Sequence, residues 1–253
     1  EEAGYEVLVF AATGAGGRSM EALIESGMVA GVLDLTTTEW ADEIAGGVLS
    51  AGPTRMDAAA TAKVPAVIAP GCLDMVNFGE RDSVPAKYEG RNFYIHNPQV
   101  TLMRTSPEEC VELGRILAEK VNAYTGPVTV LLPLRGVSVI SAEGGPFYSP
   151  EADEALFRSI HEHLAPHDVV DVGPGGRQQI DVAEVGRRAG EAAGVPGPPR
   201  RARDPGAGGA RRRRRPLLPD QLQDELGSRP RRGPEQGPDS RILVSGRRIQ
   251  AVL

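Results

Sequence analysis

The sequence is poor in cysteine and in aromatic residues, and it contains no long hydrophobic run. Its two cysteines, Cys72 and Cys110, have neither the spacing of a zinc site nor that of a disulfide framework. We interpret them as reduced thiols of a cytoplasmic protein. No stretch reaches the ~18 consecutive apolar residues of a membrane span, so we expect no transmembrane helix. Because the sequence does not begin with methionine, we expect a fragment of a longer chain.

Lysine and aromatic residues are both missing from residues 173–253, which hold 17 Arg against 9 Asp and Glu, a net charge of +8. Residues 1–172 hold 11 Lys and Arg against 25 Asp and Glu, a net charge of −14. With 14 Gly and 10 Pro, the second part is too poor in apolar residues to form a core. We predict a globular domain over 1–172. For 173–253 we predict a disordered Arg/Gly/Pro-rich tail or a reading-frame artefact.

The basic run Arg211–Arg215 is the one feature of this tail that favours nucleic-acid binding. No aromatic side chains are interleaved with it to stack on bases, so we do not expect nucleic acid as a partner.

Short runs rich in Val, Ile and Leu alternate with amphipathic segments throughout residues 1–172. The predicted strands are Glu6–Phe10, Gly31–Leu35, Ala66–Ala69, Asn92–His96, Val128–Leu132 and Asp168–Val172. The predicted helices cover residues 17–26, 39–46, 54–62, 107–123 and 150–164. This alternation predicts an α/β fold of parallel βαβ units, with helices on both faces of a mostly parallel sheet.

A glycine-rich turn links the first predicted strand to an amphipathic helix. Gly14, Gly16 and Gly17 lie in this turn. Strand, glycine-rich turn and helix N-terminus together form an arrangement that binds phosphates, because backbone N–H groups and the helix dipole point at the anion. A plain tight turn would use the same glycines, so both interpretations stand.

The turn matches no common nucleotide motif in full. The P-loop pattern is absent, and Ser19 stands where the third glycine of Gly-x-Gly-x-x-Gly should be. Asp34 ends the next predicted strand, 20 residues after Gly14, where dinucleotide-binding folds place an acid on the ribose. A nicotinamide cofactor therefore stays an option, against the alternative that Asp34 is an ordinary polar strand end.

Further polar residues follow the other predicted strands, at the edge where open α/β sheets bind ligands. Asp74 could act as a base, bind a metal or bond within its own turn. Arg104 has the fork that suits phosphate or carboxylate. The remaining residues at these positions are Thr36, Thr37, Asn77, His96, Arg135 and Ser138. No serine-hydrolase elbow and no zinc cluster is present, so we predict no protein metal site.

Five of these segments occur in a characteristic order, namely residues 12–21, 34–39, 73–79, 96–105 and 132–138. Together they resemble the second half of the Tm-one-like ATP-binding domain family over about residues 1–170. The resemblance implies a Rossmann-like, doubly wound fold, of which this chain carries the C-terminal half. It also implies that ATP is bound, with Mg²⁺ as its companion ion. A plant member of the family confers tobamovirus resistance by binding the viral replication protein.

We therefore expect a cytoplasmic, homo-oligomeric ATP-binding protein. Two alternatives remain: an enzyme for a small phosphorylated or carboxylated metabolite, with Asp74 or His96 as base, and an interaction scaffold with a structural nucleotide. Gly14, Gly16 and Gly17 are expected to approach the phosphates, and Arg104 and Arg135 to balance their charge. Thr36, Thr37 and Asp74 are expected to contact ribose, magnesium or substrate. The remaining expected cofactor-binding residues are Thr13, Arg18, Asn77 and Ser138.

Overall fold

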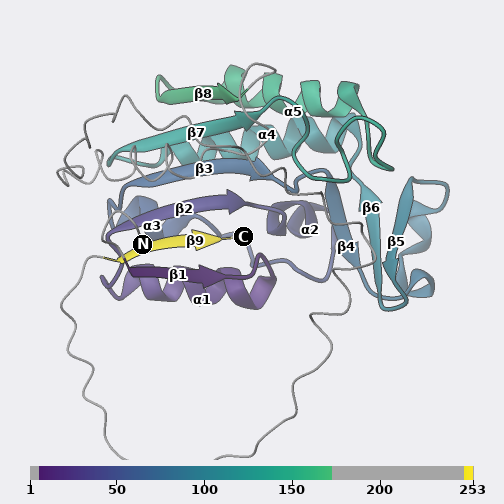
Figure 1. The fold of residues 1–253 in the computed structure, drawn as a ribbon, viewed down its shortest axis with the longest axis horizontal. Coiled ribbons are helices and arrows are strands. Elements are labelled where there is room, and N and C mark those ends of the chain that lie inside the picture. The colour runs from purple at the N-terminus through teal and green to yellow at the C-terminus, as the bar shows by residue number, and fades with distance from the viewer. Residues whose placement is uncertain (1–5, 173–247, 253) are drawn as a thin grey trace, which may run out of the picture. The chain divides into compact units, whose positions relative to one another are not determined.

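The computed structural model describes residues 6–172 and 248–252, which form a parallel sheet, a layer of helices and a small second sheet (Figure 1). The large sheet has six strands in the order β1-β9-β2-β3-β7-β8, and every neighbouring pair is parallel. These strands are β1 (Glu6–Phe10), β2 (Gly31–Thr36), β3 (Ala66–Gly71), β7 (Val128–Pro133), β8 (Asp168–Val172) and β9 (Arg248–Val252). The α/β class predicted from the alternation of segments is confirmed.

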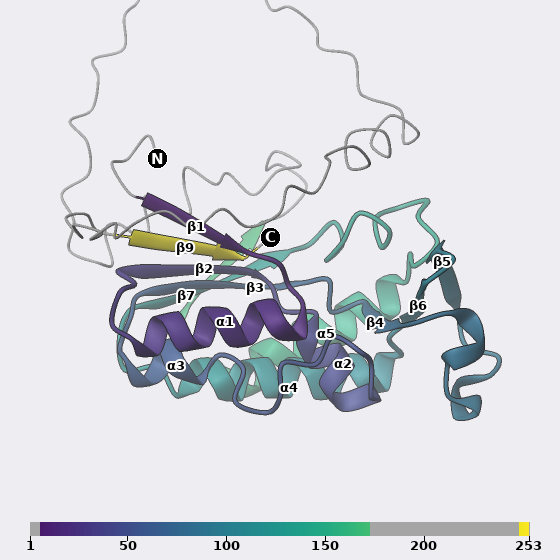
Figure 2. The same cartoon turned by 90° about the horizontal axis from the view of Figure 1, so that it is seen from below.

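The helices of the described chain lie together on one face of this sheet, as the edge-on view shows (Figure 2). They are α1 (Gly14–Glu25), α2 (Glu39–Ala45), α3 (Asp57–Thr61), α4 (Pro107–Asn122) and α5 (Pro150–His163). From β1 through β2, β3 and β7 to β8 the chain crosses the sheet in one direction. Right-handed crossovers in one direction place every connecting helix on the same face. The predicted doubly wound arrangement, with helices on both faces, is therefore not confirmed.

A second sheet lies beyond the C-terminal ends of the large sheet (Figure 1). It is antiparallel, with the order β4-β6-β5, and consists of β4 (Met75–Phe78), β6 (Val100–Arg104) and β5 (Phe93–Asn97). The prediction that residues 92–96 belong to the parallel sheet is therefore wrong. The segments predicted as loops after β3 and before α4 contain β4 and β6. Thr101, Leu102 and Met103 are all buried, so β6 lacks the polar alternation by which a strand is usually found.

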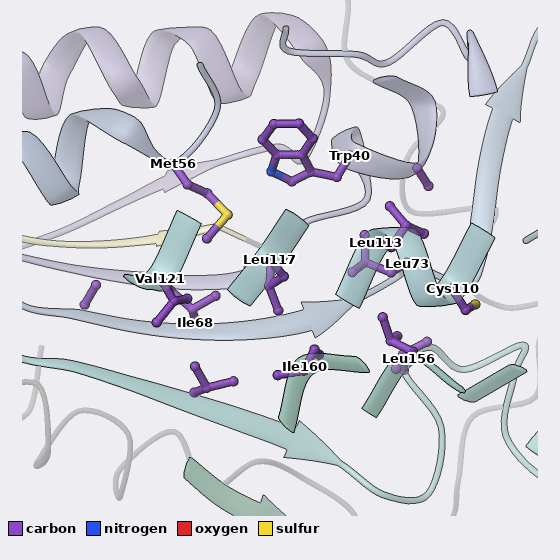
Figure 3. Close-up of a cluster of buried hydrophobic side chains, with 14 of the residues drawn as sticks. Trp40, Met56, Ile68, Leu73, Cys110, Leu113, Leu117, Val121, Leu156 and Ile160 are labelled. Atoms are coloured by element: carbon purple, nitrogen blue, oxygen red, sulfur yellow. The ribbon is translucent and has the colours of Figure 1, made fainter. Parts of the chain in front are cut away.

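The main core lies between the helix layer and the large sheet (Figure 3). β3 is buried along its whole length, as expected for a central strand of a parallel sheet. Helix α4 begins at a complete capping box, in which Ser106 Oγ accepts from the Glu109 N–H and the Glu109 carboxylate accepts from the Ser106 N–H. Its buried face, which includes Leu113 and Leu117, packs on α5 and belongs to the core cluster that also contains residues of β3 and β7.

Strand β9 comes from the part of the chain that was predicted to be a tail, and it pairs with both β1 and β2. The rest of residues 173–253 lies outside the described residues. Within the described ranges, no helix has both the length and the apolar character needed to cross a membrane.

Gly114 permits the close approach of α4 to α5, and alanine at this position should destabilise the protein. An added Cβ would lie 2.7 Å from the Leu156 carbonyl oxygen and 2.7 Å from Ser159 Cβ. Overpacking of this kind costs about 1–3 kcal/mol of folding stability. Alanine has a higher helix propensity than glycine, which returns about 1 kcal/mol, so over most of this range the net effect is a loss. Urea unfolding of Gly114→Ala should show a net loss of stability, whereas the control Val111→Ala, at an exposed position of the same helix, should change it little. A more stable Gly114→Ala variant would contradict this packing.

Candidate functional site

The glycine-rich turn leads directly into the N-terminus of α1. Thr13 is the N-cap residue, and its Oγ1 accepts from the Gly16 N–H at 3.2 Å. The Gly17 N–H donates to the Thr13 carbonyl oxygen at 2.8 Å. Within residues 6–172 and 248–252, the N–H groups of Gly14 and Ala15 have no acceptor. The first turn of α1 thus keeps two backbone donors uncommitted.

The three glycines of this turn are also required by the packing of the chain on itself. A Cβ at Gly14 would lie 2.2 Å from the Ser50 carbonyl oxygen, and one at Gly16 would lie 2.0 Å from the Ala11 carbonyl oxygen. A Cβ at Gly17 would lie 2.2 Å from Glu39 Oε1. Close internal packing therefore explains the glycines without a ligand, and a phosphate site must be argued from the free donors instead.

Arg55 forms a buried ionic cluster beside this turn. Its Nη1 and Nη2 bind both oxygens of Asp34, at 2.6 and 2.7 Å, and its Nε donates to Glu39 Oε2 at 2.9 Å. Nη1 also lies 3.3 Å from Glu21 Oε1. The guanidinium is 1% exposed, so α1, β2 and α2 are joined through one buried cation.

The Arg55 cluster was not predicted from the sequence, because its members are far apart in the chain and form no motif. Asp34 cannot also bind a ribose while both of its oxygens hold Arg55. The feature that kept a nicotinamide cofactor open is therefore explained by an internal ion pair.

Glu39 is the least satisfied member of the cluster. Its Oε1 has no hydrogen-bond partner in the described part of the chain. Burial raises the pKa of Glu39 to about 7, against the opposing effect of Arg55, while Asp34 and Glu21 raise it further. Glu39 therefore carries a proton for part of the time near neutral pH.

Two polar residues predicted to bind ligand instead support the backbone at the ends of β2 and β4. Thr37 Oγ1 donates to the Ala69 carbonyl oxygen at 3.2 Å. Asn77 is held by Asp42, which accepts from its Nδ2 and from its backbone N–H, both at 2.7 Å. Thr36 is half-buried at the end of β2, and its hydroxyl takes no part in these contacts. Of these three residues, Thr36 is the one left to face a ligand.

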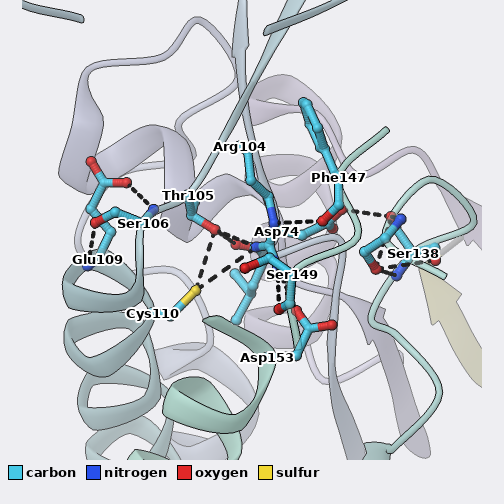
Figure 4. A network of polar contacts seen from close by, with 12 residues as sticks. Asp74, Arg104, Thr105, Ser106, Glu109, Cys110, Ser138, Phe147, Ser149 and Asp153 are labelled. Carbon is cyan, nitrogen blue, oxygen red and sulfur yellow. Dashed lines mark hydrogen bonds and ion pairs between the residues drawn. The ribbon is translucent and has the colours of Figure 1, made fainter. Parts of the chain in front are cut away.

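Arg104 is occupied by internal partners, as Figure 4 shows. Its Nη2 lies 2.6 Å from Asp153 Oδ1, and its Nε donates to the Phe147 carbonyl oxygen at 2.9 Å. Its Nη1 donates to Thr105 Oγ1 at 3.0 Å. Because Asp153 neutralises this buried guanidinium, Arg104 is not available as the predicted clamp for an external anion.

Asp74 and Ser138 were both predicted as site residues, and the fold brings them together. Ser138 Oγ donates to Asp74 Oδ2 at 2.7 Å, although the residues lie 64 positions apart. Asp74 is 0% exposed, and its Oδ1 has no partner among the described residues. Burial raises the pKa of Asp74 to about 6, although the bond from Ser138 and the charge of Arg104 oppose this change.

His96 and Arg135 are exposed and do not join these groups. His96 lies near Tyr94 in the small sheet, with 6.3 Å between the ring centroids. Arg135 follows β7, which is four strand positions from β1. At about 4.8 Å per strand, the ends of β7 and β1 are roughly 19 Å apart. The predicted site residues thus separate into two groups, one at the α1 N-terminus and one around Asp74.

Comparisons with known proteins place the chain in a family. A family model described as the uncharacterised protein family (UPF0261) C-terminal domain matches residues 1–174. A UPF0261 protein of Clostridium tetani is 56% identical over 162 residues, which are 64% of this chain and 40% of that protein. The corresponding protein of Rhizobium meliloti is 52% identical over 159 residues, 63% of this chain and 40% of the relative.

A plant protein also matches this chain. The ToMV resistance protein Tm-1 of Solanum lycopersicum is 47% identical over 157 residues, covering 62% of this chain and 21% of the plant protein. The family resemblance found in the five sequence segments is thereby confirmed. The matched region spans about 40% of the bacterial relatives' length.

Removal of Arg55 should destabilise the fold strongly. Arg55→Met leaves Asp34, Glu39 and Glu21 without their cation, and breaking a buried ion pair from one side costs about 3–5 kcal/mol. The matched control is Arg81→Met, because Arg81 is 38% exposed, pairs with the exposed Glu89 and lies over the Phe93 ring, where about 0–2 kcal/mol in all is expected. Chemical denaturation of both variants measures the difference. Equal stability losses would show that the Arg55 cluster contributes no more than a surface pair.

Glu39 should make stability fall as pH rises toward 7. The folded state keeps a proton on Glu39 up to a pKa of about 7, whereas the unfolded carboxyl loses it near 4.5. The folded state therefore binds more protons in this window, and stability declines by at most roughly 1.4 kcal/mol per pH unit. Asp42 and Asp74, each with a pKa near 6, add to the decline at lower pH. Glu39→Gln should flatten the slope between pH 6 and 7, and an unchanged slope would contradict this assignment.

Proposed function

Since the chain belongs to the uncharacterised protein family UPF0261, whose C-terminal domain it carries, we propose that it binds the phosphates of a nucleotide at the N-terminal turn of α1. ATP is the nucleotide implied by the resemblance of the five sequence segments. The described residues contain no group of three or more His, Cys, Asp or Glu side chains able to hold a metal. Mg²⁺ would therefore arrive with the ATP phosphates rather than occupy a protein site.

The observation that supports this proposal is the charge pattern of the helix N-termini. The first turns of α2, α4 and α5 each carry two acidic residues, which balance the positive end of the helix dipole. The first turn of α1 carries none, and the exposed Arg18 follows it. Two N–H donors without an acceptor among the described residues, a first turn without an acidic residue of its own, and the exposed Arg18, whose Nη1 donates to the Ser50 carbonyl oxygen at 3.0 Å, are the elements that would attract a phosphate.

The roles of the other predicted ligands change accordingly. Arg104 is bound to Asp153 and Arg135 lies too far along the sheet edge, so Arg18 supplies the positive side chain in this proposal. The end of β2 is two strand positions from β1, roughly 10 Å away. A nucleotide extending from α1 along the sheet edge would bring its ribose toward Thr36. Thr13 contributes indirectly, because it caps α1 and fixes the turn.

Calorimetric titration with ATP and Mg²⁺ tests this proposal. Ala15→Asp places a carboxylate in the first turn, where it should stabilise α1 by about 0.3–1 kcal/mol while repelling phosphate. Arg18→Glu reverses the nearby charge. Both variants should bind at least tenfold more weakly than the wild type. Gly16→Val is not suitable, because its Cβ would meet the Ala11 carbonyl oxygen at 2.0 Å and distort the turn.

Arg135→Glu is the matched control, because it makes the same charge change at the far end of the sheet edge. It should bind ATP as the wild type does. Thermal unfolding of each variant separates lost binding from lost folding. Wild-type affinity in Ala15→Asp would overturn the placement of phosphate on α1, and absence of binding by the wild type would overturn the proposed function.

A further inference from the structure

We infer that Ser138 and Asp74 form a nucleophilic dyad that acts on a neutral carboxylic ester. The two side chains meet at the C-terminal edge of the sheet, where Asp74 follows β3 and Ser138 follows β7 (Figure 4). Ser138 is half-buried, whereas Asp74 is fully buried. An accessible nucleophile backed by a buried base is the arrangement that nucleophilic catalysis requires.

The hydrogen bonds of Ser138 leave one position open on its oxygen. A serine hydroxyl has one proton and two lone pairs. The proton is directed to Asp74 Oδ2 at 2.7 Å, and one lone pair accepts from the Ser141 N–H at 3.1 Å. Ser141 Oγ lies 3.4 Å from Ser138 Oγ, but its proton is directed to the Ser138 carbonyl oxygen at 3.2 Å, so the second lone pair of Ser138 Oγ is the one available for attack. The Ser138 N–H donates to Ser141 Oγ at 3.0 Å, which fixes the turn that presents the nucleophile.

Asp74 is suited to accept the proton of Ser138. In the described chain its carboxylate receives a hydrogen bond on Oδ2 while Oδ1 remains without a partner at 0% exposure. A poorly solvated carboxylate is a stronger base than one in water, and the pKa of Asp74, raised by burial to about 6, is close to neutral pH. The ionisable groups around it are Cys72, Arg104 and Asp153, and Arg104 is paired with Asp153.

The charges around the dyad favour an ester over a phosphorylated substrate. Arg104 is neutralised by Asp153, so among the residues that the structure describes no free buried cation lies beside the Asp74 carboxylate, which would repel a phosphate dianion. An uncharged carbonyl group meets no such repulsion. Val139, 91% exposed, directly follows Ser138. This apolar surface suits the hydrocarbon part of an ester.

Backbone donors follow the nucleophile directly. Within the described residues, the N–H groups of Val139 and Ile140 have no acceptor. The N–H of the residue after a nucleophilic serine is a common donor to the oxyanion formed during acyl transfer. These two groups are therefore the available donors for the oxygen that becomes negative.

The reaction proceeds in two balanced steps. Ser138 Oγ forms a bond to the ester carbonyl carbon while its proton moves to Asp74. The bond to the alcohol oxygen then breaks, and the alcohol leaves with the proton from Asp74. In the second step water attacks the acyl-serine, giving its proton to Asp74, which returns it to Ser138 Oγ as the carboxylic acid departs. No oxidant, reductant or metal is needed.

Labelling with a fluorophosphonate tests the dyad directly. In this reaction Ser138 Oγ bonds to phosphorus, fluoride leaves, and the hydroxyl proton passes to Asp74. Intact wild-type protein should be labelled at Ser138, as located by peptide mass spectrometry, at least tenfold above heat-denatured protein. The labelling rate should rise as pH increases through about 6, where Asp74 loses its proton. Hydrolysis of p-nitrophenyl acetate should show the same pH profile.

Three variants distinguish a catalytic role of Ser138 and Asp74 from a purely structural role in holding the Ser138–Ser141 turn. Ser138→Ala should abolish labelling at this peptide, and Asp74→Asn should lower the rate at least tenfold and remove the rise near pH 6. Ser83→Ala is the matched control, because Ser83 is exposed and bonds only within its own turn; it should be labelled at Ser138 as the wild type is. Wild-type labelling no higher than that of denatured protein would overturn the dyad, whether or not ATP binds.

Discussion

The buried guanidinium of Arg55 determines how the first half of this domain is arranged. It joins Asp34 of β2 and Glu39 of α2, whose side chains are less than 10% exposed, to Glu21 of α1, whose side chain is 13% exposed. A buried cation must be paired to offset its lost hydration, so these carboxylates are committed to structure. The same contact places Glu39 against Gly17, which is why the start of α1 tolerates no side chain there. The N-terminus of α1 is thereby held firmly while its own first turn stays free of acid.

The direction in which the chain crosses the sheet explains where polar groups gather. Each step from β1 to β8 is parallel and in the same direction, so all the connecting loops after strands open at one edge. The small antiparallel sheet lies at that same edge (Figure 1). Two groups of polar residues are separated along this edge. One is the turn after β1 that begins α1, and the other is the Asp74–Ser138 pair after β3 and β7, at least three strand positions away. The proposed phosphate site and the proposed dyad are physically independent.

Local patterns in the sequence predicted much of the fold, whereas long-range pairing was beyond them. Helix α4 was predicted to within one residue because Ser106 and Glu109 encode its cap locally. Strand β6 was missed because its residues are buried without alternation, and Asp34 could not be matched with Arg55 because ion pairing leaves no periodic signal. Arg104 has the side chain of an anion clamp, but only the structure shows that Asp153 already occupies it. Residue type indicates what a group can bind, and the fold decides whether it is free.

The central claim is that the backbone of the α1 N-terminus is an anion site, and amide chemical shifts test it most directly. The ¹⁵N–¹H spectrum of the full chain would be recorded during titration with ATP and Mg²⁺, and separately with inorganic phosphate. We expect the largest shifts in both titrations on the amides of Gly14 and Ala15, because a hydrogen bond to phosphate forms there. Saturable shifts elsewhere, with the Gly14 and Ala15 amides unmoved, would contradict it.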